Sequence, residues 1–331
     1  MESSAGTIST VWTWADRLGA VAVRCNVGRM HYTVAPGLYA VNEPGPDAPV
    51  FVSANYKLSF DHLRRALHGI SGWLLVLDTR GINVWCAAGK GTFGTAELVQ
   101  RVQAVDLAQR VSHRTLIVPQ LGAPGVAAHE VHKQTGFRVV YGPVRAQDIP
   151  AFLRDGMKAD AAMRMVQFRL ADRLAVVPVE LVIAAKYALV LAAAFALMAG
   201  WRGGGWAWTN LPTQGVLAAA SVLGGYLFVG VAVPGLLPWL PSRAFSIKGV
   251  FAGVLAWLLL WALGAYTRAI DLAAWLLLLC VMASFMALNF TGASTYTSLS
   301  GVKKETRIAI PVMAAGLLVA LGLWIRACGI L

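Results

Sequence analysis

The segment 81–90, GINVWCAAGK, contains one cysteine, Cys86. Among the residues of this chain, Cys86 is the best placed for chemistry. Cys86 directly follows a predicted buried strand and precedes a predicted helix. The free N–H groups and the positive dipole end of a helix N-terminus favour a thiolate, which is a strong ligand for soft transition metals. The alternative is a small apolar cysteine packed in a core, because most single cysteines are buried in this way. Position alone leaves both interpretations open.

Strand–loop–helix units are predicted on both sides of Cys86. The continuous apolar runs 73–77, 115–118 and 137–141 are typical of parallel strands that are covered on both faces. Helices are predicted over 95–110, 125–134 and 147–155. Alternating strands and helices joined by short loops predict a doubly wound, Rossmann-like α/β sheet. Upstream, residues 20–54 are predicted as strands with Pro and Gly turns, and Ser59 is predicted to cap a helix over 59–67.

Open α/β sheets bind ligands outside the carboxyl ends of their strands. In this chain those ends are predicted at 78–86, 119–125 and 142–145, and all three stretches are rich in Gly, Pro and small residues. Small residues let the backbone approach a large planar ring with a nucleotide tail. Flavin or nucleotide binding would give the same pattern, although the absence of GxGxxG after any strand disfavours a dinucleotide.

The second half of the chain is predicted to lie in a membrane. The 331 residues are 57% hydrophobic and 13% charged, whereas soluble domains average about 25% charged residues. Five apolar stretches reach the length of about 20 residues that a helix needs to cross a bilayer. They are 178–200, 213–233, 246–266, 271–290 and 308–326, within a membrane domain expected over 178–331.

Basic residues set the expected orientation of these spans. Most of them flank one side of the bundle, and the positive-inside rule places that side in the cytoplasm. They are Arg164, Arg169, Arg173, Arg243, Lys248, Lys303, Lys304 and Arg307. No signal peptide is visible, so we expect a cytoplasmic domain over 1–155, an inner-membrane location and a C-terminus outside. The net charge of +12 is then explained by the bilayer and not by nucleic acid.

Two further segments have patterns that suggest contacts with the membrane or between domains. Residues 156–177 interleave basic and apolar side chains, which predicts an amphipathic linker helix at the inner membrane surface or a plain solvated linker. Residues 289–302, NFTGASTYTSLSGV, are rich in hydroxyl groups. They are interpreted as a helix end whose Ser and Thr satisfy backbone groups, or as a binding surface for the soluble domain or a metal path.

The four cysteines of the chain are far apart. They are Cys25, Cys86, Cys280 and Cys328, and no CxxC occurs. This spacing excludes a self-contained iron–sulfur cluster or zinc ribbon in this chain. A reaction that needs electrons would therefore require a second protein.

Four segments of the chain resemble one protein family. NVWCAAGK (83–90) resembles the signature of the HgcA family, the membrane-anchored corrinoid proteins of microbial mercury methylation, which are related to the corrinoid iron–sulfur protein. SANYKLSFDHLR (53–64), PQLGAPG (119–125) and YGPV (141–144) resemble the corrinoid-binding fold of that superfamily. The resemblance implies a Rossmann-like corrinoid-binding domain followed by a membrane domain, with a corrinoid (cobalamin, containing cobalt) as cofactor.

The resemblance also implies the residues of the site. Cys86 is the implied catalytic residue and the axial thiolate ligand of cobalt, on the helix that caps the corrinoid. The cobalamin motif DxHxxG is absent, so a histidine ligand of that type is not implied. The other residues implied to line the ring are Thr79, Asn83, Val84, Trp85, Ala87, Ala88, Gly89, Lys90, Gly91, Thr92, Gln120, Leu121, Gly122, Ala123, Gly125, Val126, Gly142, Pro143 and Val144. The six histidines are interpreted as surface or structural residues.

The implied reaction is methyl transfer from a methyl-Co(III) corrinoid to Hg(II), giving methylmercury. An axial thiolate pushes electron density onto cobalt and suits loss of the methyl group as a carbanion equivalent, while radical transfer stays open. The implied partners are an HgcB-type ferredoxin with two 4Fe–4S clusters, as electron donor and Hg(II) carrier, and a methyl donor of the folate type. The alternatives are corrinoid methyl transfer to another acceptor in one-carbon metabolism, and a membrane transporter that senses cobalamin.

Overall fold

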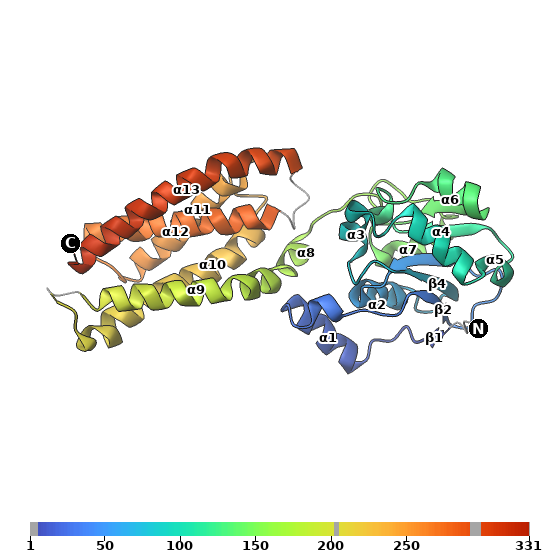
Figure 1. Ribbon diagram of the computed structural model, residues 1–331, viewed down its shortest axis with the longest axis horizontal. Helices are drawn as coiled ribbons and strands as arrows, with labels where there is room; N and C mark the ends of the chain where they lie inside the picture. Colours follow the sequence, from blue (N-terminus) through green and yellow to red (C-terminus); the bar gives the residue numbers. More distant parts are fainter. Residues whose placement is uncertain (1–5, 202–204, 292–298, 331) are drawn as a thin grey trace. The chain divides into compact units, whose positions relative to one another are not determined.

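The computed structural model describes residues 6–201, 205–291 and 299–330. The chain divides into two compact units, and the boundary falls between Gln167 and Phe168, inside the predicted linker. The first unit is a mixed α/β domain and the second is all-helical (Figure 1). The predicted fold class is therefore confirmed.

A six-stranded sheet organises the first unit, in the order β1-β2-β4-β3-β5-β6. The strands are β1 (Gly6–Ile8), β2 (Gly37–Val41), β3 (Val50–Ala54), β4 (Gly72–Leu77), β5 (Thr115–Val118) and β6 (Arg138–Tyr141). Strands β4, β3, β5 and β6 run parallel, while β2 pairs antiparallel with β4. Every residue of β3 is buried, as expected for a central strand that is covered on both faces.

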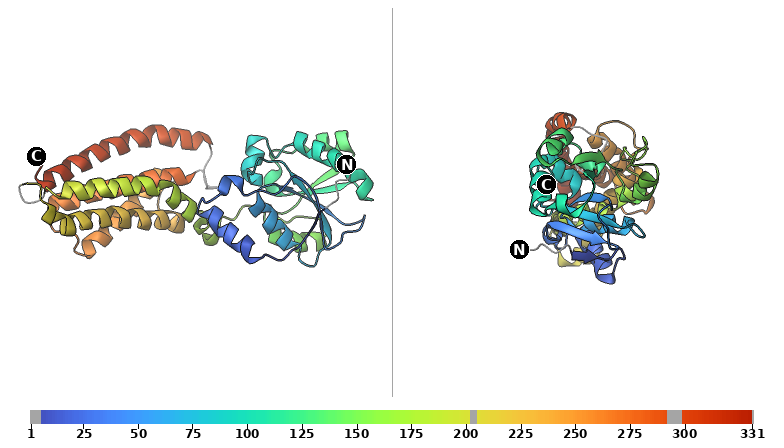
Figure 2. Two further views of the ribbon diagram at one scale, coloured as in Figure 1. Left: turned by 60° about the horizontal axis from the view of Figure 1, so that its bottom comes forward. Right: turned by 90° about the vertical axis from the view of Figure 1, so that its right-hand side faces the viewer.

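Helices cover both faces of this sheet (Figure 2). On one face the core joins the sheet to α3 (Val84–Lys90), α4 (Thr95–Ala104), α5 (Leu107–Arg110) and α6 (Ala128–Thr135). On the other face it joins the sheet to α2 (Lys57–Ala66) and α7 (Ile149–Arg154). Val52 belongs to the first core and its neighbour Phe51 to the second, because successive strand residues point to opposite faces.

Two predicted helices of the first unit differ from the structure. The helix predicted over 95–110 is divided into α4 and α5, because Asp106 adopts a left-handed backbone conformation with φ of 48°. The helix predicted to be capped by Ser59 instead begins at Lys57 with Tyr56 as its N-cap. Residues 20–24, predicted within a strand-rich stretch, are the end of helix α1 (Trp14–Arg24).

A buried cluster of charged side chains fastens α1 to α2. Lys57 Nζ lies 2.6 Å from a carboxylate oxygen of Asp16 and 2.6 Å from one of Asp61. Arg64 lies 2.8 Å from Asp16 and 2.7 Å from Asp61. Burial raises the pKa of Asp16, but hydrogen bonds from Lys57, Thr13 and Arg64 outweigh burial and hold that pKa well below its usual value. We call these four residues, Asp16, Lys57, Asp61 and Arg64, the charge clamp.

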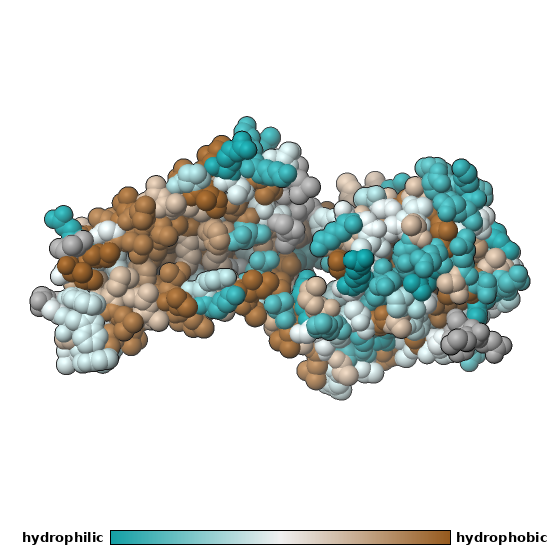
Figure 3. Space-filling model, viewed as in Figure 1, coloured by the Kyte–Doolittle hydropathy of each residue, from teal (hydrophilic) through white to brown (hydrophobic). Residues whose placement is uncertain are grey.

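The second unit contains α8 (Leu170–Leu174), α9 (Val177–Ala199), α10 (Val216–Leu236), α11 (Phe245–Ala262), α12 (Ala269–Phe290) and α13 (Leu299–Cys328). In the described part of the chain, five helical stretches are long and apolar enough to cross a membrane. They are Leu170–Ala199, Trp208–Leu236, Phe245–Ala262, Ala269–Phe290 and Ser300–Cys328. The face of this unit seen in Figure 3 is predominantly apolar. The prediction of a membrane protein with five apolar helices is therefore supported, with the spans extended at several ends.

Glycines allow α11 and α12 to pack closely. A Cβ atom added at Gly249 would lie 2.4 Å from the Cα of Ser284, and one at Gly253 would lie 2.5 Å from the Cα of Cys280. The two helix backbones are too close here for any side chain larger than that of glycine. Small residues four positions apart produce the same close packing in membrane helices.

The structure does not form the single amphipathic helix predicted over 156–177. Gly156 and Met157 both have positive φ after the end of α7, and Phe168 has positive φ before α8. These left-handed residues interrupt a right-handed helical path, so α8 begins only at Leu170. Of the hydroxyl-rich segment 289–302, positions 292–298 lie outside the described residues.

Candidate functional site

The carboxyl ends of the parallel strands meet at one edge of the sheet. The loop after β4 leads into α3, the loop after β5 forms the short helix Gln120–Gly122, and the loop after β6 contains residues 142–145. Helix α3 contacts both β3 and the Gln120–Gly122 turn. The strand ends predicted at 78–86 and 119–125 therefore meet at α3.

Polar contacts fix the loop that precedes α3. The side-chain oxygen of Asn55, at the end of β3, accepts hydrogen bonds from the Thr79 backbone N–H (3.1 Å), the Thr79 hydroxyl (2.8 Å) and the Gly81 N–H (3.0 Å). Arg80 and Gly81 both have positive φ, which reverses the chain direction. Thr79 is fully buried, so its role in the structure is to hold this loop.

Helix α3 places Cys86 in its first turn. Asn83 is the N-cap, and its side-chain oxygen accepts a hydrogen bond of 3.0 Å from the backbone N–H of Cys86. The Cys86 side chain is exposed and free of any disulfide. Trp85 beside it is 44% exposed. The cysteine is therefore accessible, and the alternative of a buried, core-packed cysteine does not describe it.

Several residues implied to line the ring pack against the protein interior, within α3 or in the loops next to it. Ala87 and Ala88 are buried in the core, as is Val126. A Cβ atom on Gly122 would lie 2.5 Å from the Phe93 ring, and one on Gly125 would lie 2.1 Å from the Phe93 carbonyl oxygen. Gly91 ends α3 in the left-handed conformation, with φ of 81°. Gly89 and Lys90 lie on the exposed surface, while Thr92 and Ala123 are half-buried. The close backbone approach at Gly122 and Gly125 thus serves packing within the protein.

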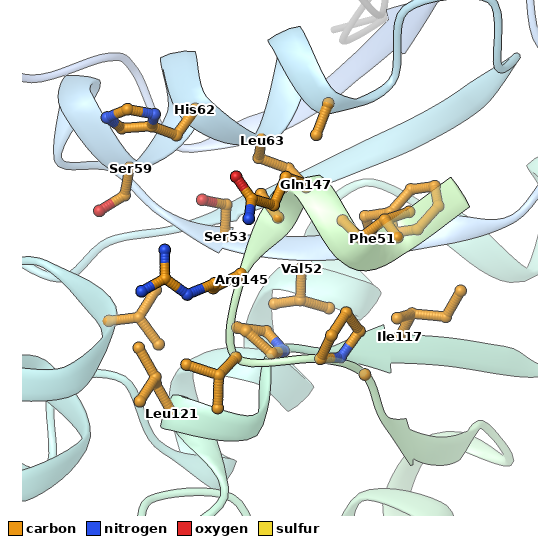
Figure 4. Close-up of a pocket in the computed structure, with 18 of the residues that line it drawn as sticks. Phe51, Val52, Ser53, Ser59, His62, Leu63, Ile117, Leu121, Arg145 and Gln147 are labelled. Atoms are coloured by element: carbon orange, nitrogen blue, oxygen red, sulfur yellow. The ribbon is translucent and has the colours of Figure 1, made fainter. Parts of the chain in front are cut away.

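A cavity of about 880 Å³ opens beside the start of α3. Seven of the implied ring residues line it: Asn83, Val84, Trp85, Leu121, Gly142, Pro143 and Val144. Cys86 is not one of the lining residues. In Figure 4, Ser59, His62 and Arg145 lie toward one end of the cavity and Phe51 and Ile117 toward the other. The cavity therefore has a polar, basic end and an apolar end.

Sequence reasoning missed the contribution of α2 to this cavity. Ser59, His62, Leu63 and Ala66 line it from one side of that helix. Their spacing of three and four residues is the signal that could have placed them on one helix face. Partial removal from water lowers the pKa of His62, and the charges of Arg24 and Arg65 lower it further, which favours the neutral imidazole.

One buried acceptor at this edge lacks a partner. The side-chain oxygen Oε1 of Gln120 is inaccessible to solvent, and no hydrogen-bond donor reaches it among the residues that the structure describes. A buried polar atom without a partner is uncommon in folded proteins and suits a ligand that brings its own donor. In the same described ranges, no three His, Cys, Asp or Glu side chains gather in a group that could hold a metal ion.

Comparison with known proteins shows what the domain that carries this site is similar to. Residues 28–153 match the family model of the CO dehydrogenase/acetyl-CoA synthase delta subunit. This stretch covers the sheet from β2 to β6 together with the cavity. The first unit is therefore similar in sequence to that family of subunits over most of its length.

Individual relatives give the same result. The acetyl-CoA decarbonylase/synthase complex subunit gamma of Archaeoglobus fulgidus is 36% identical over 122 residues, which are 36% of this chain and 26% of that protein. The corrinoid/iron–sulfur protein large subunit of Moorella thermoacetica is 32% identical over 117 residues, which are 35% of this chain and 25% of that protein. The chain thus spans about a quarter of the length of these curated relatives.

Proposed function

We propose that this chain is a corrinoid-dependent methyltransferase whose methyl acceptor is Hg(II), with methylmercury as product. The observation that carries the proposal is the exposed Cys86 in the first turn of α3, next to a large cavity at the strand ends. This arrangement occurs in a domain similar to a corrinoid/iron–sulfur protein large subunit. Hg(II) as acceptor rests on the resemblance of residues 83–90 to the mercury-methylation family.

The residues of the site fit a corrinoid in two respects. The cavity volume of about 880 Å³ is at the upper end of the range for small-molecule sites, about 300–1,000 Å³. Two arginines that line the cavity, Arg65 and Arg145, suit the phosphate of a nucleotide tail.

Each residue of the site then has a definable task. When bound, the corrinoid would supply a cobalt-bound methyl group for transfer. The Cys86 sulfur would bind the metal, and the Asn83 cap holds the backbone of Cys86 in place. The apolar side chains of Trp85, Leu121 and Val144 would contact the organic part of the cofactor and exclude water from it.

The test is methylmercury formation by the full chain in nanodiscs, loaded with methylcorrinoid and supplied with Hg(II). We expect product from the wild type and none from Cys86→Ala. Cys25→Ala is the matched control, because it removes another free thiol of the first unit and should retain activity. Equal product from the wild type and Cys86→Ala would refute the assigned role of Cys86.

A different methyl acceptor is the second candidate function. The relative from Archaeoglobus fulgidus is named as a subunit of an acetyl-CoA decarbonylase/synthase complex, which favours an acceptor in one-carbon metabolism. The same loaded protein, offered Hg(II) or a thiol such as coenzyme A, separates the two candidates. Loss of the bound methyl group to the thiol but not to Hg(II) would favour the second.

The remaining parts of the proposal concern orientation and electrons. We propose that the first unit lies in the cytoplasm. Arg243 just before α11, Lys248 in the first turn of α11, and Lys303, Lys304 and Arg307 near the start of α13 follow the positive-inside rule. We also propose a separate ferredoxin of the HgcB type as reductant. Protease access in sealed inverted vesicles tests the orientation, and reductive titration of the loaded protein with and without the ferredoxin tests the partner.

A further inference from the structure

Helix α1 exposes a row of large apolar side chains. Trp14 is 77% exposed, Leu18 66% and Val21 59%. At 100° per residue these three positions fall within an arc of about 60° on one side of the helix. Val11, Val27 and Met30 extend the exposed apolar surface before and after the helix. Figure 3 shows apolar side chains gathered over α1.

This concentration is unusual within the first unit. Ten large apolar side chains are exposed there among the described residues, and six of them lie between residues 11 and 30. Of the other four, Trp85 belongs to the candidate site, and Met157, Met165 and Val166 lie near the end of the unit. Exposed apolar side chains gathered in this way mark an interaction surface.

The opposite side of α1 fixes which face is exposed. Asp16, Ala20 and Val23 are buried, and Asp16 is held by Lys57 and Arg64 of the charge clamp. The helix therefore cannot turn its apolar row inward without breaking two ion pairs. The row is a permanent feature of the folded unit.

The charge around the apolar row has one sign. Asp16 is the only acidic residue between positions 6 and 41, and it is buried and paired. Arg17 is exposed and lies over the Trp14 ring at 5.5 Å, while Arg24 and Arg29 are partly exposed. An apolar row containing Trp, flanked by arginines, has the composition of helices that lie in the interface of anionic membranes.

We infer that α1 docks on the surface of an anionic lipid bilayer, with Trp14, Leu18 and Val21 among the lipid headgroups and Arg17, Arg24 and Arg29 facing lipid phosphates. The first candidate span begins at Leu170, three positions after the first unit ends at Gln167. This short connection keeps the first unit at high effective concentration near the bilayer, so weak interfacial contacts suffice. The inference does not depend on the proposed methyl transfer.

The test uses the full chain in liposomes that contain a photoactivatable phospholipid. The vesicles are phosphatidylcholine alone, or phosphatidylcholine mixed with phosphatidylglycerol, and mass spectrometry locates the lipid adducts. We expect adducts in residues 11–30 in the mixed vesicles and a marked loss of them in phosphatidylcholine alone. Adducts in the five candidate spans serve as the internal reference for insertion.

Two variants with matched controls separate the apolar and the charged contributions. Leu18→Glu should lose the adducts in residues 11–30, whereas Gln134→Glu, which adds the same charge on α6, should keep them. Arg17→Glu should weaken them, whereas Lys133→Glu on α6 should not. Wild-type protein labelled in the spans but not in residues 11–30 would overturn the inference and point to a protein partner. Adducts unaffected by Leu18→Glu would overturn it as well.

Discussion

Removing one carboxylate from the charge clamp should destabilise the first unit strongly. Asp61 has a side chain that is 1% exposed and contacts Lys57 at 2.6 Å and Arg64 at 2.7 Å. In Asp61→Asn both cations retain Asp16 as a partner but lose their second carboxylate. Breaking a buried ion pair costs about 3–5 kcal/mol. Because Lys57 is 27% exposed and Asp16 remains, we expect the lower end, about 3 kcal/mol.

Hydrogen exchange measured by mass spectrometry on the full chain in nanodiscs is the suitable assay. It reports exchange in β3 and β4 of the first unit separately from exchange in the second unit. A loss of about 3 kcal/mol speeds exchange through cooperative opening by roughly 100-fold in these strands. Glu130→Gln on α6 is the matched control, since it removes a half-exposed carboxylate from another helix of the same unit. Its exchange should change by less than about threefold, as for other surface substitutions.

Exchange in Asp61→Asn that matches the control would refute the argument that the clamp stabilises the unit. It would mean that the attraction between the paired charges only offsets the free energy of removing them from water, as in some buried salt bridges.

Three further predictions follow from local geometry. Gly125→Ala should destabilise the first unit by about 1–3 kcal/mol in thermal unfolding, because its Cβ would lie 2.1 Å from the Phe93 carbonyl oxygen. The control Gly89→Ala should be nearly neutral, because no atom lies near the added Cβ. Because the pKa of Asp16 is lower in the folded than in the unfolded chain, its ionised carboxylate stabilises the folded first unit at pH values above the unfolded pKa of about 3.9. The free energy of unfolding should therefore fall as the pH drops below about 4, and it should fall less steeply in Asp16→Asn. Gly253→Ile should reduce the yield of folded protein in detergent, because the α11 and α12 backbones would separate.

The alternation of apolar runs and loops was sufficient to predict the parallel strands β4, β5 and β6, but not the antiparallel pairing of β2 with β4. The strands predicted at 73–77 and 115–118 correspond to β4 and β5 within one residue. Such strands are buried on both faces, so their continuous hydrophobicity is visible without knowledge of their neighbours. The five apolar helices were predictable for a similar reason, because length and composition decide whether a helix can cross a bilayer.

The sequence also placed Cys86 at the start of a helix, because Asn83 is a strong N-cap and the preceding loop contains Gly81. It did not show which neighbours of Cys86 face a ligand. Ala87, Gly122 and Gly125 lie close to it in sequence or at strand ends, yet each packs against the protein interior. Small residues permit close approach by a ligand and by the chain itself equally well, and only the fold distinguishes the two.

The sequence by itself determined the elements of this protein: the α/β alternation, the apolar helices and the place of Cys86 between a strand and a helix. The structure decided that Cys86 is exposed. Tertiary structure alone decided which distant residues meet. It brought Ser59 and His62 of α2 to the same cavity as Arg145, and it paired Asp16 of α1 with Lys57 and Arg64. Local patterns report propensity and periodicity along the chain, whereas cavities and ion-pair clusters depend on contacts between segments that the chain brings together only when it folds.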